Sequence, residues 1–183
     1  YTLLCLTYRV NLHPKERLMD ELDGMYQQMI VNIGDRYQKS ANFLETVMDK
    51  IAYHESRRDP ACKQIGGGPG RGLYQFEKGP KEGGETAMNR LLRWFSRNQV
   101  DAPEWTHIST KEGVDATNVP KLGQDMMFLA NVRYHPKASF KGLIMKDLPV
   151  WWAKYHWAGP EHQAEARIKA FNSSMHFYPG PVL

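Results

Sequence analysis

Glu55 is the residue whose type and position carry the most chemistry in this 183-residue chain. It follows a run of apolar residues that recur with a helical period, and at about 100° per residue it falls near the middle of their stripe. Burial at a helix end raises the pKa of a carboxyl group, because desolvation disfavours the charged form. Such a group could hold a proton near neutral pH and donate it to the leaving oxygen of a glycoside.

The sequence leaves a structural alternative open for this glutamate. Arg57, Arg58 and Arg71 follow closely, and a buried glutamate paired with one of them would have no catalytic role. His54 and Glu55 also begin like the His-Glu-x-x-His zinc motif, but Arg58 stands where the second histidine is needed. We therefore expect no metal site and no cofactor.

Two short motifs support the catalytic interpretation: Glu55-Ser56 and, after a glycine-rich stretch, Gly72-Leu73-Tyr74-Gln75. Their order resembles the soluble lytic transglycosylase and goose-type lysozyme superfamily, whose signature is a Glu-Ser pair followed by Gly-Leu-Met-Gln. Tyr74 stands at the usual methionine position. The segment 155–159 resembles the family's later Ala-Tyr-Asn-Ala-Gly segment but lacks its asparagine.

A narrower resemblance is to lysozyme-like proteins of bacteriophage particles, and it covers roughly residues 45 to 160. The stretches that carry it are residues 64–67, 71–77, 83–84, 147–149 and 152–160.

The resemblance implies a role for each matching residue. Glu55 would be the catalytic acid and, in a transglycosylase, the base of the second half of the reaction. Glu77 is a candidate second carboxylate, although a solvated charge paired with Lys78 explains it equally well. Without a second carboxylate, the substrate's own N-acetyl or 6-hydroxyl group would complete the reaction. The substrate-binding residues implied are Ser56, Gly72, Tyr74, Gln75 and Tyr155, and Tyr155 would support Glu55 or the substrate from a later helix.

Composition indicates a globular protein, because 42% of the residues are hydrophobic and 24% are charged. The net charge of +4 suits a polyanion or an acidic cell envelope. Two cysteines, Cys5 and Cys62, exclude a disulfide-rich scaffold and leave one disulfide between them open. The most apolar stretch, residues 1–10, is far shorter than the roughly 20 residues that span a bilayer, so no membrane span is expected.

Apolar periodicity predicts a mainly α-helical fold, of α+β lysozyme-like type by resemblance, with a small β or loop excursion holding residues 72–77 beside the groove. Residues 1–35 are predicted to form an N-terminal segment that contacts a partner, with a break at Gly34-Asp35. Residues 36–183 would form the lysozyme-like catalytic domain. The helices are expected at about 13–30, 36–55, 86–98, 121–134, 149–158 and 161–171. At most one or two of the five tryptophans are expected in the groove.

The resemblance implies a peptidoglycan glycosidase that cleaves the β-1,4 bond between N-acetylmuramic acid and N-acetylglucosamine. It also implies a virion protein that opens the cell wall as the phage genome enters, with glycan strands and other virion proteins as partners. One alternative is a structural virion protein with a lysozyme-like fold and no activity. The other is a nucleic-acid-binding protein, suggested by Arg90, Arg93 and Arg97 along one helix; a solvated helix face explains these arginines, so nucleic acid is not expected.

Overall fold

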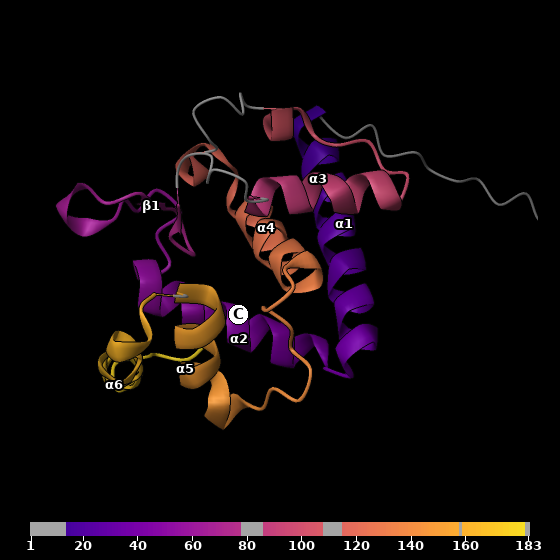
Figure 1. Ribbon diagram of the computed structural model, residues 1–183. Helices are drawn as coiled ribbons and strands as arrows, with labels where there is room; N and C mark the ends of the chain where they lie inside the picture. Colours follow the sequence, from indigo (N-terminus) through magenta and orange to yellow (C-terminus); the bar gives the residue numbers. More distant parts are fainter. Residues whose placement is uncertain (1–13, 78–85, 108–114, 158, 182–183) are drawn as a thin grey trace, which may run out of the picture.

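The computed structural model describes residues 14–77, 86–107, 115–157 and 159–181. The architecture is mainly helical, as the sequence predicted (Figure 1). The α-helices are α1 Pro14–Tyr37, α2 Ala41–Ser56, α3 Ala87–Arg97, α4 Lys121–Tyr134, α5 Leu148–Trp151 and α6 Ala164–Met175. Short 3-10 turns are η1 Ile65–Gly67, η2 Glu104–His107, η3 Ala116–Asn118, η4 Met145–Asp147 and η6 Glu161–Gln163, and η5 Trp152–Trp157 is π-helical.

Helix α4 is the centre of the molecule. Every residue from 123 to 130 is buried, which is typical of a helix surrounded by other elements. Helices α1 and α3 both pack against it, and α2 crosses below them in Figure 1. The core therefore lies around α4, and α2 enters it along one face.

Helix α2 confirms the apolar period of the sequence, because its inward face is buried. The predicted start at residue 36 is wrong, because α1 continues to Tyr37 and α2 begins at Ala41. The side chain of Ser40 caps its first turn by accepting a hydrogen bond from the Phe43 N–H at 3.1 Å. Arg57 ends it in the left-handed region, with φ of 56°. The buried residues of the helix are Leu44, Val47, Met48, Ile51, Ala52 and Ser56.

The predicted break at Gly34-Asp35 is wrong, because α1 continues through both residues to Tyr37. Gly34 instead lets the backbone of Lys39 lie close to the helix. The Gly34 carbonyl oxygen accepts a hydrogen bond from the Lys39 N–H at 2.9 Å, and a Cβ at Gly34 would lie 2.7 Å from the Lys39 oxygen. Several α1 side chains belong to the common core: Leu22, Tyr26, Met29, Ile30 and Ile33. Partner contact by residues 1–35 stays a prediction, and residues 1–13, with Cys5, lie outside the described residues.

The predicted excursion is a two-stranded antiparallel hairpin, β1 Gly70–Arg71 and β2 Phe76–Glu77, with Gly70 opposite Glu77. Within the predicted excursion, residues 72–75 form the turn between the strands. The glycines at 83–84, which contribute to the resemblance, lie outside the described residues.

The predicted helix from Pro149 is divided into two kinds of helix. Its first turn, α5, begins one residue earlier, and the chain then continues as the π-helical turn η5. Trp152 and His156 lie four residues apart in η5, about one turn, so they share one side of it. No helix among the described residues is long and apolar enough to cross a membrane.

Candidate active site at the end of helix α2

Glu55 lies in the last turn of α2, where η5 packs against it. Its Oε1 accepts a hydrogen bond from the Trp152 indole N–H at 2.7 Å, and His156 Nε2 lies 3.8 Å away. The side chain is 15% exposed, so it is largely desolvated but still reaches the surface. Burial raises the pKa of Glu55 from 4.5 to about 7, although the Trp152 hydrogen bond and Arg167 favour the charged form. The carboxyl group is thus protonated below neutral pH.

His156 is a neutral neighbour of this carboxyl group. Its Nε2 lies 2.9 Å from the Tyr74 carbonyl oxygen, which can only accept, so Nε2 carries the proton. Burial lowers the pKa of His156 to about 4. Between about pH 4 and pH 7, Glu55 and His156 are therefore both uncharged, and their contact is not an ion pair.

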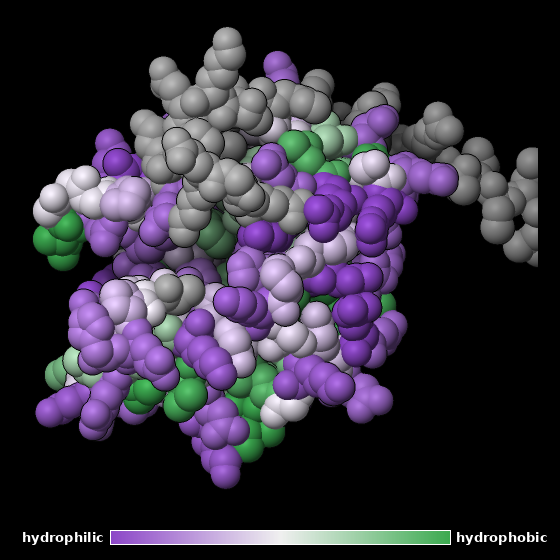
Figure 2. Space-filling view, viewed as in Figure 1, coloured by the Kyte–Doolittle hydropathy of each residue, from purple (hydrophilic) through white to green (hydrophobic). Residues whose placement is uncertain are grey.

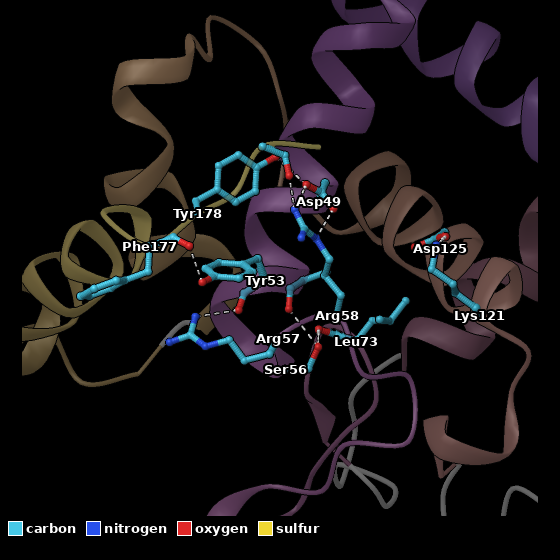
Figure 3. Close-up of polar contacts among 12 residues, drawn as sticks. Asp49, Tyr53, Ser56, Arg57, Arg58, Leu73, Lys121, Asp125, Phe177 and Tyr178 are labelled. Atoms are coloured by element: carbon cyan, nitrogen blue, oxygen red, sulfur yellow. Dashed lines mark hydrogen bonds and ion pairs between the residues drawn. The ribbon is translucent and has the colours of Figure 1, made fainter. Parts of the chain in front are cut away.

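Ser56 fixes the end of α2 to the turn of the hairpin. Its buried hydroxyl lies 2.9 Å from the Ala52 carbonyl oxygen and 3.0 Å from that of Leu73 (Figure 3). The Leu73 N–H in turn donates to Gln124 Oε1 at 2.7 Å. The Glu-Ser pair and the Gly-Leu-Tyr-Gln motif are therefore joined by hydrogen bonds, and Ser56 acts in the structure as a buried connector.

Gly72 is the position in this turn that requires glycine. Its φ is +72°, and a Cβ there would lie 2.2 Å from Gln124 Oε1. Gln124 is fully buried, and its Nε2 donates to the carbonyl oxygens of Pro60 and Val119, each at 3.0 Å. One buried amide from α4 thus holds three loop segments together, and one of them is the turn that Ser56 contacts.

Tyr74 points into the core, with its residue only 2% exposed. Its hydroxyl donates to Asp125 Oδ1 at 2.5 Å, and its ring stacks on Phe128. Burial raises the pKa of Asp125 to about 6. The side chain of Tyr74 therefore does not contact Glu55. Its backbone oxygen accepts the hydrogen bond from His156, which is the neighbour of Glu55.

Gln75, Glu77 and Tyr155 lie in three different settings. Gln75 has φ of 49°, and its Nε2 donates to the Gly72 oxygen at 2.9 Å inside the turn. Glu77 is exposed on β2. Tyr155 is half-buried, and its ring packs against Trp151 at 6.1 Å between centroids. The structure therefore gathers the predicted residues from 55 to 75 at one junction, and it places Tyr155 on the Trp151 side of η5.

The arginines that could have paired with Glu55 have other partners. Arg58 forms two 2.7 Å hydrogen bonds to the carboxylate of Asp49, which also accepts from the Tyr178 hydroxyl (Figure 3). Arg57 donates to the Tyr53 carbonyl oxygen at 3.0 Å. Arg71 Nε lies 3.6 Å from Asp115. Trp152 and His156 of η5 contact the Glu55 carboxyl group instead.

The surface is hollowed next to this junction. Figure 2 shows a recess between the side of the molecule that carries the hairpin and the side that carries α5 and α6, and the end of α2 lies between these parts in Figure 1. In the described part of the chain, no group of three or more histidine, cysteine, aspartate or glutamate side chains is arranged to hold a metal ion.

Three residues of this site were not predicted from the sequence: Trp152, His156 and Gln124. Trp152 and His156 occur at i and i+4 within the tryptophan-rich segment, a spacing that could have indicated a shared face. Gln124 carries no signal, because a glutamine in a helix is ordinarily exposed. Compared with family models, curated proteins and solved structures, the chain gives no match.

Proposed function

We propose that this protein is a peptidoglycan glycosidase that cleaves the β-1,4 bond between N-acetylmuramic acid and N-acetylglucosamine, with Glu55 as the general acid. The observation that carries the proposal is a largely buried carboxyl group in the last turn of α2, with a pKa raised to about 7. The end of this helix lies between the two sides of the molecule that border the recess in Figure 2. Glycoside cleavage requires a proton donor of this kind.

Trp152 and His156 suit this role. The indole N–H occupies Oε1, which leaves the other carboxyl oxygen of Glu55 to deliver the proton to the leaving oxygen. As the glycosidic C–O bond breaks, Glu55 becomes a carboxylate, and the Trp152 N–H favours that charged form. Because the His156 ring is neutral, it places no positive charge beside Glu55 that would favour loss of the proton.

The second half of the reaction returns a proton to Glu55. In a lytic transglycosylase, the 6-hydroxyl oxygen of the muramic acid attacks C1, its proton goes to the Glu55 carboxylate, and an anhydro sugar forms. In a muramidase, water attacks C1 and gives its proton to a carboxylate, with Glu77 as the candidate second group. Exchange with solvent then removes the proton from Glu77 and returns one to Glu55. A helical fold with a hairpin beside the site supports a lysozyme-like protein, and the resemblance to lysozyme-like proteins of phage particles supports a virion setting.

A second candidate is a structural virion protein with a lysozyme-like fold and no activity. The missing asparagine in the segment 155–159 favours it, together with the packing of Tyr155 against Trp151.

Digestion of purified peptidoglycan separates the two candidates. We expect the wild-type protein and Glu165→Gln, the same change at an exposed α6 residue, to release muropeptides, and Glu55→Gln to lose at least about a hundredfold in rate. Mass spectrometry of the products distinguishes anhydro from reducing ends. Equal release by both variants would exclude Glu55 as the acid, and no release by any folded protein would favour the structural candidate.

A further inference from the structure

A second hollow, of about 590 Å³, lies between the ends of α1 and α4 and the loop that follows α4. Its lining includes the permanent cations Arg36, Arg133 and Lys141 together with His135. None of the described residues that line it is an aspartate or a glutamate. We call this hollow the basic pocket.

Positive charge is concentrated further around one wall of the basic pocket, the ring of Tyr134. The guanidinium carbon of Arg133 lies 5.0 Å from the ring centroid, and those of Arg93 and Arg97 on α3 each lie 5.5 Å from it. These guanidinium groups add positive charge beside the basic pocket, and positive charge at a surface hollow attracts anions. The arrangement therefore favours an anionic ligand with more than one negative charge.

Hydrogen bonds fix the frame of the basic pocket before any ligand binds. The Tyr37 hydroxyl donates to the Val132 carbonyl oxygen at 3.1 Å, and the Lys141 N–H donates to Ser139 Oγ at 3.1 Å. His135 Nδ1 accepts from the Lys137 N–H at 3.2 Å. Because Nδ1 accepts, a neutral His135 carries its proton on Nε2 and is a donor there.

The position of the basic pocket separates it from Glu55. Helix α2 begins at Ala41, just after Gln38 of the pocket lining, whereas Glu55 lies in the last turn. Fourteen residues of helix span about 21 Å. A ligand here would therefore bind at the opposite end of α2 from the candidate active site.

We propose that the basic pocket binds a small phosphate ester, either free or as a short run of phosphodiesters. Planar arginine forks bind phosphate oxygens in pairs, and a phosphate monoester or a short run of diesters supplies the charge that three cations match. The hollow is of the size that proteins use for small ligands. This proposal goes beyond the glycosidase activity and does not depend on it.

Nucleic acid fits these observations less well, because it is bound along an extended series of cationic side chains. Arg90, the first of the three regularly spaced arginines on α3, is buried and donates to Asn131 Oδ1 at 2.6 Å. Arg36, Arg133 and Lys141 instead line a single hollow.

Titration calorimetry with defined probes tests the proposal on the full chain. The probes are glycerol 3-phosphate, a poly(glycerol phosphate) chain, glycerol and a duplex DNA of mixed sequence. We expect saturable binding of a phosphate probe that Arg133→Gln/Lys141→Gln weakens about tenfold or more. Lys169→Gln, which removes an exposed charge on α6, should change the affinity less than about twofold. Circular dichroism confirms that the variants are folded.

Each outcome bears on the proposal. Binding of glycerol 3-phosphate as tightly as the polymer, per phosphate, supports a small free ester, whereas binding of the polymer alone supports a phosphodiester chain. No saturable binding, or an equal loss in Lys169→Gln, overturns the proposed site. Tighter binding of duplex DNA than of either phosphate probe, lost in the double variant, overturns the ligand class. These readouts involve no catalysis, so they are independent of the peptidoglycan assay.

Discussion

The buried Glu55 carboxyl group must make the folded protein less stable as the pH rises, and Glu55→Gln should remove this dependence. The pKa of Glu55 is about 7 in the folded protein and 4.5 in its ordinary state. The folded protein therefore holds a proton that the unfolded chain loses between pH 4.5 and 7. The rise in pKa from 4.5 to about 7 corresponds to about 3 kcal/mol of unfolding free energy, fully retained below pH 4.5 and lost by about pH 7.

Urea unfolding at a series of pH values from about 4 to 8 measures this term. His54 and His156 titrate in the opposite direction, since burial lowers the pKa of each to about 4, and Asp125 also contributes. The wild-type profile alone is therefore a mixture. The difference between the wild type and Glu55→Gln at each pH isolates Glu55, because the other groups are common to both proteins.

We expect Glu55→Gln to gain about 3 kcal/mol relative to the wild type between pH 4 and pH 8. The amide of the variant retains an oxygen that can accept the Trp152 N–H bond. Glu165→Gln, at an exposed position, should show a nearly constant difference from the wild type. A constant difference for Glu55→Gln as well would mean that Glu55 titrates as an ordinary glutamate, and it would remove the physical basis of its role as the acid.

Two further variants test the contacts around the site. Gly72→Ala should destabilise the protein by about 3 kcal/mol, because a Cβ at this position would lie 2.2 Å from the Gln124 side-chain oxygen. Gly142→Ala is the control: its φ is also positive, at +71°, but the space around it is open, so the loss should be about 1 kcal/mol. Equal losses of stability in thermal melts would refute the close approach at Gly72. Trp152→Phe removes the N–H that favours the charged form, so the pKa of Glu55 should rise further. A carboxyl NMR titration measures this shift, and an unchanged midpoint would show that the hydrogen bond is unimportant.

The parts of the fold that the sequence predicted are those determined by local pattern. Helix α4 begins and ends at the predicted bounds, 121–134. In α2, the same period put Glu55 on the inward face of a helix, and the structure places its side chain against η5. Short-range rules suffice in these segments because burial and helix geometry agree.

The rest of the site depends on contacts between distant parts of the chain. Trp152 lies 97 residues from Glu55, and no local pattern shows which tryptophan donates its N–H. The π-helical turn that presents Trp152 and His156 together has hydrogen bonds that span one residue more than those of an α-helix, and the apolar period does not reveal it. At Gly34, the sequence signal was interpreted as a break, but the glycine permits the close approach of Lys39.

A protonated carboxyl group at a helix end persists only if other contacts hold that end in place, because its burial works against folding at neutral pH. At the end of α2, the hairpin side is held by Ser56. The other side is held by the C-terminal segment, through the Asp49–Arg58–Tyr178 cluster and the Tyr53 hydroxyl bonded to the Phe177 oxygen at 2.7 Å (Figure 3). Asp49 binds Arg58, the second residue after the helix, at 2.7 Å. The cluster therefore anchors the helix end on which Glu55 is buried.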